Sequence, residues 1–163
     1  MIKIGIITAS DKGSKGERVD QSGAVIREIV EQINGEVILY EILPDEQEAI
    51  AKALIRFADQ EQLDLILTTG GTGLGPRDVT PDATLQVIDK VVPGIAEVMR
   101  MESLKKTNRA MLSRAVAGIR KKSLIINLPG SPKAVRECLE VVLPALPHGI
   151  EILKGEAGEC ARE

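Results

Sequence analysis

Aromatic residues are nearly absent from this chain of 163 residues, which contains one Phe, one Tyr and no Trp. Proteins that bind single-stranded nucleic acid or RNA stack the bases on aromatic side chains, and this chain has too few of them. An excess of positive charge is also missing, because 21 basic and 24 acidic residues give a formal charge of −3. Such a balance gives no general attraction to phosphate backbones or anionic lipids. We therefore expect no nucleic-acid partner.

Histidine, cysteine and long apolar runs are scarce as well. One His cannot form a histidine cluster, and Cys138 and Cys160 are not spaced as a metal clip. The apolar stretch from Val141 to Ile150 contains two prolines and is far shorter than the roughly 20 residues that cross a bilayer. The first residues show neither a basic leader nor a small-residue cleavage site. These absences predict a cytoplasmic protein with reduced thiols and without a membrane segment.

The residues that are present have the composition of an ordinary globular protein. Of the chain, 44% is hydrophobic and 28% is charged, and its length suits one hydrophobic core. We expect a single domain over residues 1–154, followed by a loosely ordered tail over residues 155–163.

Apolar β-branched runs alternate with helical periodicity along the chain. Strands are predicted at Ile2–Thr8, Glu36–Leu43, Leu63–Thr69 and Ser123–Leu128, while residues 109–120 fit either a strand or irregular structure. Strands that alternate with helices predict a mainly parallel sheet with helices on both faces, which is a three-layer α/β/α sandwich. Ligands bind such folds beyond the carboxyl ends of the strands.

A glycine-rich segment, GGTGLGPRDVTPD, follows the third predicted strand and runs from Gly70 to Asp82. Glycines let a ligand approach the backbone closely, and successive N–H groups in such a loop attract anions, so phosphate is a natural ligand. The segment matches neither the dinucleotide-binding fingerprint nor the P-loop. A tight turn between strand and helix also calls for glycine. Phosphate binding and turn geometry therefore remain two explanations of the same segment.

Three aspartates accompany these loops. Asp45, with Glu48 three residues later, predicts a helix capping box, and Asp82 falls in the first turn of a helix that Thr80 is expected to cap. Capping and function both remain open for these two aspartates. Asp78 lies inside the turn, where no helix cap requires it, and an Asx turn that stabilises the loop stays open as an alternative to function. Carboxylates beside a phosphate-binding loop are suited to Mg²⁺, which takes oxygen ligands and shares the phosphates of a substrate.

Several of these stretches together resemble the molybdopterin adenylyltransferase family of molybdenum cofactor biosynthesis. The matching stretches are ITASDKG in the first loop, LPDEQ at Asp45, GGTGLGPRDVTPDAT, LSR at Ser113 and INLPGSPKAVRECLE. The resemblance covers nearly the whole chain, and MoaB-like proteins and the gephyrin G domain are related to the family. It implies an α/β/α domain that assembles as a homotrimer. It also implies transfer of AMP from ATP to molybdopterin with release of pyrophosphate.

The resemblance implies roles for individual residues too. The family's two essential aspartates fall at Asp45 and Asp78, which we expect to be catalytic and to hold Mg²⁺. ATP and molybdopterin are expected to bind Ser10, Asp11, Gly70, Gly71, Thr72, Gly73, Asp82, Ser113, Pro129, Gly130, Ser131 and Pro132. The expected downstream partner is a molybdenum-insertion enzyme. Two other functions stay open, namely a MoaB-like molybdopterin-binding protein and a non-catalytic carrier or scaffold for the pterin.

Overall fold

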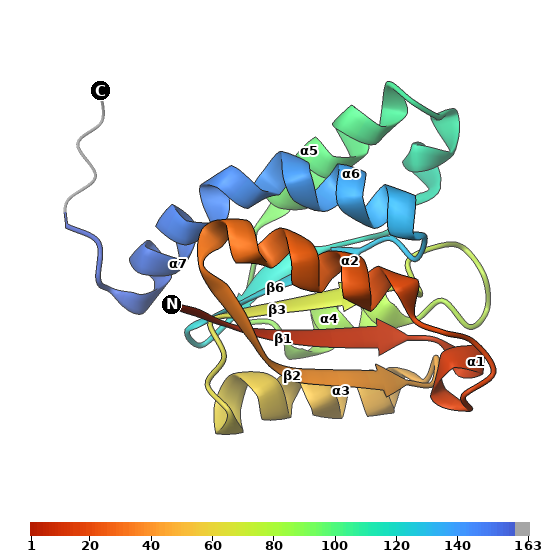
Figure 1. Cartoon of the computed structure of the whole chain (residues 1–163), viewed down its shortest axis with the longest axis horizontal. Coiled ribbons are helices and arrows are strands. Elements are labelled where there is room, and N and C mark those ends of the chain that lie inside the picture. The colour runs from red at the N-terminus through yellow and green to blue at the C-terminus, as the bar shows by residue number, and fades with distance from the viewer. Residues whose placement is uncertain (159–163) are drawn as a thin grey trace.

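A six-stranded sheet lies between two layers of helices in the computed structural model, which describes residues 1–158 (Figure 1). The strands are β1 (Ile2–Ala9), β2 (Gly35–Leu43), β3 (Leu65–Thr69), β4 (Lys90–Val91), β5 (Ala117–Arg120) and β6 (Ser123–Leu128). The α-helices are α1 (Asp11–Ser14), α2 (Gln21–Val30), α3 (Gln47–Ile55), α4 (Thr80–Val87), α5 (Pro93–Leu104), α6 (Pro132–Val142) and α7 (Leu146–Lys154). Four short helical turns complete the described part: η1 (Glu31–Ile33), η2 (Arg56–Gln60), η3 (Asn108–Leu112) and η4 (Leu143–Ala145).

The sheet has the order β2-β1-β3-β6-β5-β4. The first four strands in this order pair in parallel, and the pairs β6–β5 and β5–β4 are antiparallel. The mainly parallel sheet and the three layers are thus confirmed. The uncertain segment 109–120 divides into η3 and the strand β5. The tail expected over residues 155–163 extends into residues 159–163, which lie outside the described residues.

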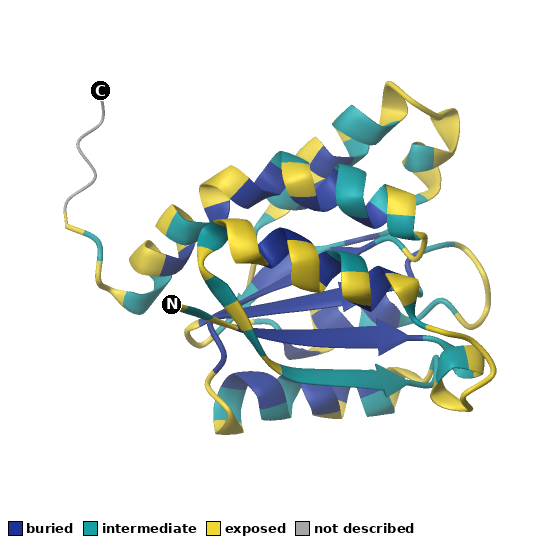
Figure 2. Ribbon diagram, viewed as in Figure 1, coloured by how far each residue is buried: buried dark blue, intermediate teal, exposed yellow. Residues whose placement is uncertain are grey.

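Both faces of the sheet are covered by apolar side chains. Figure 2 shows β1, β3 and β6 largely buried, with the exposed residues of the helices turned outward. On one face, Ile4 and Ile6 join a cluster with α2, α5, α6 and α7, while on the other Ile7 joins a cluster with α3 and α4. Burial on both faces explains why these strands are continuous apolar runs instead of alternating ones. No helix within residues 1–158 is long and apolar enough to span a bilayer.

Two predicted helix caps are wrong. The N-cap of α3 is Glu46, and no side chain caps this helix, so Asp45 does not form a capping box with Glu48. The N-cap of α4 is Val79, and the hydroxyl of Thr80 makes no capping hydrogen bond. Pro81 and Asp82 do lie in the first turn of α4, as the sequence indicated. Helix capping therefore does not account for Asp45, which leaves its carboxylate for other contacts.

The apolar run from Val87 to Val92 also differs from its prediction. In the sequence, Val87, Ile88, Val91 and Val92 follow helical spacing, which predicts that they face inward. In the structure, α4 ends at Val87, and Val91 lies in the edge strand β4 with 54% of its surface exposed. A strand alternates its side chains between two faces, whereas a helix collects them on one. Helical spacing alone does not show that a single apolar run changes from helix to strand.

A buried amide ties β6 to the strand and the helix that flank the glycine-rich loop. The side-chain amide nitrogen of Asn127 donates to the hydroxyls of Thr68 (3.0 Å) and Thr84 (2.9 Å), and its amide oxygen accepts from the backbone N–H of Val116 (3.2 Å). All three side chains involved are completely buried. The network joins β3, β6 and α4 beneath the loop.

Replacing Asn127 with alanine is expected to lower the free energy of unfolding by roughly 3 kcal/mol, because it leaves buried polar groups without partners. Urea denaturation followed by far-UV circular dichroism measures the change. Asn108→Ala is the matched control, since Asn108 is exposed and its replacement should have little effect. An equal loss of stability in both variants would contradict a special role for the Asn127 network.

Candidate active site

A cavity of about 840 Å³ opens at the carboxyl ends of β1, β2 and β3. Strand order reverses here, because β2 and β3 lie on opposite sides of β1, and such a switch point leaves a crevice between the loops. The cavity is lined by nine of the residues that sequence analysis proposed as catalytic or binding residues: Ser10, Asp11, Asp45, Gly70, Gly71, Asp78, Gly130, Ser131 and Pro132. The topology thus brings together loops that are far apart in the sequence.

The glycine-rich loop fits tightly against the end of β1. Gly70 and Gly71 have φ values of +90° and +68°, in the left-handed region. A Cβ at Gly70 would lie 2.5 Å from the carbonyl oxygen of Ala9, which leaves no room for a side chain. Turn geometry therefore requires these glycines. The same two residues line the cavity, so the backbone is also accessible to a ligand there.

Asp11 and Asp45 hold two of the loops together. The backbone N–H of Asp11 donates to Oδ2 of Asp45 (2.9 Å), and the N–H of Asp45 donates to Oδ1 of Asp11 (3.0 Å). Arg77 adds a bidentate contact to both carboxylate oxygens of Asp11, at 2.9 and 3.1 Å. This contact lowers the pKa of Asp11 below its usual value, so its carboxylate stays ionised. Asp45 Oδ1 makes no hydrogen bond within residues 1–158 and is directed toward Gly71.

Asp78 is positioned by its own loop. Its Oδ2 accepts a hydrogen bond from the N–H of Gly75 (2.9 Å), whereas its Oδ1 accepts none from any described residue. Burial raises the pKa of Asp45, and the neighbouring charges of Asp11 and Asp78 raise it further. Both carboxylates line the cavity and each keeps an oxygen without a hydrogen bond from any described residue, an arrangement that favours a cation nearby. The cavity therefore has a negatively charged corner that suits a hard metal ion.

Arg114 is not among the residues predicted from the sequence, but its side chain binds three residues of the glycine-rich segment. Its guanidinium donates to the carbonyl oxygens of Gly73 (2.9 Å) and Asp78 (2.7 Å) and to both carboxylate oxygens of Asp82 (3.2 and 3.0 Å). Its backbone N–H donates to the carbonyl of Thr72 (2.9 Å). Asp82 is thus a partner of Arg114, which lowers the pKa of Asp82. The position of this arginine next to Ser113, inside the stretch LSR, was its only sequence signal.

Comparisons with known proteins identify the family of this chain. Residues 5–148 match a family described as "Probable molybdopterin binding domain". The chain belongs to this family. It is 51% identical over 156 residues to a molybdopterin adenylyltransferase of Helicobacter pylori, covering 94% of this chain and 89% of that protein. It is 40% identical to a molybdopterin adenylyltransferase of Escherichia coli K12, covering 99% of this chain and 90% of the relative.

Solved structures of this molybdopterin-binding family share the fold. The structure of the molybdopterin biosynthesis enzyme MoaB from Thermus thermophilus has a TM-score of 0.91 and 53% sequence identity, covering 98% of this chain and all of that chain. The match extends over nearly the whole described sheet and its helices, so the α/β/α fold found here is that of the family.

A second cavity of about 300 Å³ lies on the other side of the family's glycine-rich loop. It is lined by the remaining proposed binding residues, Thr72, Gly73, Ser113 and Pro129, together with apolar residues of α5 and α6. Asp82 lines neither cavity, and its carboxylate forms an ion pair with Arg114. The structure therefore divides the predicted set between two adjacent cavities that share one loop.

Asp20 lines the first cavity of this family member, and Tyr40 supports it from β2. Asp20 accepts hydrogen bonds from the hydroxyls of Tyr40 and Thr8 and from the N–H of Gly23. Burial, together with the hydrogen bond to Asp20, raises the pKa of Tyr40 to about 12. Tyr40 is the only tyrosine and the chain has no tryptophan, so its ionisation can be followed by ultraviolet absorbance without interference.

We expect the phenolate absorbance of the folded protein to rise near pH 12, about two units above the usual tyrosine value. Between about pH 10 and pH 12, the folded state then retains the Tyr40 proton that the unfolded state has lost. Stability from this group is therefore complete below the unfolded pKa and falls as pH rises from about 10 to about 12. Denaturation of the wild type and of Tyr40→Phe across this range measures the difference. An equally steep loss of stability in Tyr40→Phe would show that Tyr40 does not cause it.

Proposed function

We propose that this chain is a molybdopterin adenylyltransferase, which transfers AMP from Mg-ATP to molybdopterin and releases pyrophosphate. The observation that carries the proposal is the placement of Asp45 and Asp78 in one cavity, each with an unused carboxylate oxygen, beside a glycine-rich loop. Relatives that are 51% and 40% identical bear the name molybdopterin adenylyltransferase, which supports the same activity.

Mg²⁺ is part of this proposal, and the residues present fit it. The oxygens Asp45 Oδ1 and Asp78 Oδ1 are the proposed ligands. The buried hydroxyl of Thr80 has no hydrogen-bond partner among residues 1–158 and lies 2.4 Å from the point that a Cβ of Gly71 would occupy. No group of three or more His, Cys, Asp or Glu side chains gathers as a metal site in residues 1–158. Mg²⁺ at this position would take its other ligands from water and phosphate oxygens. Bound Mg²⁺ would neutralise the negative charge of the polyphosphate.

The reaction requires positioning and neutralisation of charge more than covalent catalysis. An oxygen of the pterin phosphate forms a bond to the α-phosphorus of ATP, and the bond from that phosphorus to pyrophosphate breaks. In this proposal, the backbone of Gly70 and Gly71 and the loop Gly130–Pro132 hold phosphates, while Asp45 and Asp78 would hold Mg²⁺ beside them. The remaining part of a substrate would bind in the second cavity, which is lined by Thr72, Gly73, Ser113 and Pro129.

A second candidate function is that of a MoaB-like molybdopterin-binding protein. The Thermus thermophilus structure with 53% identity bears the name MoaB, which favours this alternative. A non-catalytic carrier of the pterin is the third possibility. Each of these would bind molybdopterin without forming an adenylylated product, so a single assay separates them from the transferase.

The deciding experiment is an anaerobic incubation of the purified protein with molybdopterin and Mg-ATP. We expect adenylylated pterin and pyrophosphate to appear in equal amounts, and neither to appear when molybdopterin is left out. Binding of molybdopterin without either product would contradict the transferase and favour the MoaB-like protein or the carrier.

Assembly and location complete the proposal. We propose a homotrimer of single-domain subunits, each formed by residues 1–154, because the resemblance to the family implies this assembly. Exposed apolar side chains on α5 and η3 suit a subunit interface: Val98, Met101, Leu104 and Met111. Sedimentation velocity tests it, and a monomer at all concentrations would contradict it. The use of ATP suits a cytoplasmic protein that passes its product to a molybdenum-insertion enzyme.

A further inference from the structure

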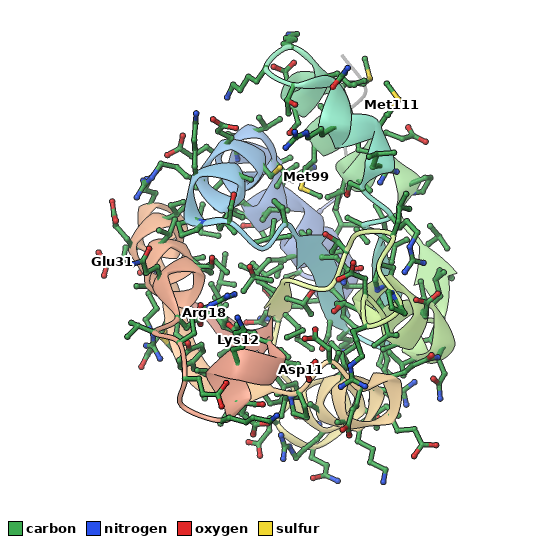
Figure 3. All side chains as sticks on the ribbon, turned by 90° about the vertical axis from the view of Figure 1, so that its right-hand side faces the viewer. Asp11, Lys12, Arg18, Glu31, Met99 and Met111 are labelled. Carbon is green, nitrogen blue, oxygen red and sulfur yellow. The ribbon has the colours of Figure 1, made fainter. Side chains whose placement is uncertain are left out.

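Two cations on the wall of the first cavity have no partner in the described chain. Lys12, on α1, and Arg18, in the loop that follows, both line the cavity. Neither side chain makes a hydrogen bond or an ion pair within residues 1–158, whereas Arg77 and Arg114 are each held by a carboxylate. Figure 3, which looks onto the carboxyl ends of β1, β2 and β3, shows Lys12 and Arg18 near each other between α1 and α2. An unpaired cation pair facing a cavity favours an anionic ligand.

The carboxylates of the same cavity do not neutralise these cations. Asp11 is engaged by Arg77 and by the N–H of Asp45, and both oxygens of Asp20 accept hydrogen bonds. Only Asp45 and Asp78 among the described lining residues keep an unused carboxylate oxygen, and they lie beside the glycine-rich loop. The cavity therefore contains a negatively charged corner and a separate positively charged side.

The positive side is connected to the negative corner through α1. Lys12 directly follows Asp11, whose backbone is hydrogen-bonded to Asp45 Oδ2. Lys12, Asp45 and Asp78 line the same cavity, so a polyphosphate bound there would lie within one space bounded by both the carboxylates and the cations. In the proposed reaction, the part of ATP that departs is the pyrophosphate.

We propose that Lys12 and Arg18 form the binding site for the pyrophosphate part of ATP and for the pyrophosphate product, an inference that rests on the proposed function. When the bond at the α-phosphorus breaks, its electron pair leaves with pyrophosphate, which gains negative charge. Two cations placed at the leaving group stabilise this charge. The pair would thus both select a triphosphate over a monophosphate and assist cleavage of the bond between the α-phosphorus and pyrophosphate.

The test is isothermal titration calorimetry with inorganic pyrophosphate plus Mg²⁺, and separately with AMP, on the purified full-length protein. We expect Lys12→Ala and Arg18→Ala each to weaken pyrophosphate binding by on the order of 10-fold, the ratio that corresponds to one lost charge-assisted hydrogen bond. Affinity for AMP should not change. Lys15→Ala is the matched control, because Lys15 carries the same charge on the same loop but does not line the cavity.

Steady-state kinetics supply a second, independent readout. The two variants should raise the KM for Mg-ATP and leave the KM for molybdopterin unchanged. The inference would be overturned if both variants kept the pyrophosphate affinity of the wild type. It would also be overturned if they lost AMP affinity to the same extent, or if only the KM for molybdopterin rose. A wild type that binds pyrophosphate through Lys12 and Arg18 but forms no adenylylated pterin would instead overturn the proposed function and leave this site in place.

Discussion

Replacing Arg114 with alanine is expected to lower the turnover of adenylylation by on the order of 100-fold, although Arg114 lines neither cavity. Its guanidinium holds the carbonyls of Gly73 and Asp78 and the carboxylate of Asp82, so one side chain fixes both ends of the segment that carries Asp78. A catalytic group that moves by about 1 Å can lose this much activity. We expect kcat to fall, with a much smaller change in the KM for molybdopterin.

Arg120 provides the matched control for this experiment. It also donates to one carbonyl, that of Val87, and to both carboxylate oxygens of Asp59, but it lies at the end of β5 and lines neither cavity. Arg120→Ala should cost stability without a comparable loss of turnover. Added guanidinium should restore part of the activity of Arg114→Ala, because it can occupy the vacated position. If Arg114→Ala and Arg120→Ala lost turnover equally and guanidinium restored none of it, the role of Arg114 would be purely structural.

The parts of the fold that followed from the sequence are those governed by local pattern. The strands β1, β3 and β6 are apolar on both faces, and this forces them into the middle of a covered sheet. Their carboxyl ends then lie at one edge, which brings the loops at Asp11, Gly70 and Gly130 together without further information. The site was predictable to the extent that it consists of loops following buried strands.

The remaining parts depend on contacts between segments that no local pattern describes. Arg114 reaches Asp82 across 32 positions, and Asn127 reaches Thr68 across 59. In a sequence, a single arginine is most simply interpreted as a solvent-exposed charge, because only the fold shows which carboxylate it contacts. For the same reason, Asp45 resembled a helix cap, because only the tertiary structure shows that its carboxylate is bound to the backbone of Asp11.

Replacing Asp78 with asparagine is expected to lower adenylylation by on the order of 10² to 10³-fold, the loss typical of removing one electrostatic contact from a reacting centre. The amide oxygen of asparagine can still accept the hydrogen bond from Gly75, so the loop keeps its shape and the change isolates the charge. Molybdopterin affinity should therefore stay close to that of the wild type.

Glu46→Gln is the control for Asp78→Asn, because Glu46 is an exposed neighbour of Asp45 that lines neither cavity. The assay measures adenylylated pterin and pyrophosphate at saturating Mg-ATP, with molybdopterin binding measured in parallel. Loss of turnover in Asp78→Asn, but not in Glu46→Gln, would mean that charge at this one position is required. Full turnover in Asp78→Asn would exclude Asp78 as a ligand of the catalytic metal, and a parallel loss of molybdopterin binding would place its role in binding instead of in the chemical step.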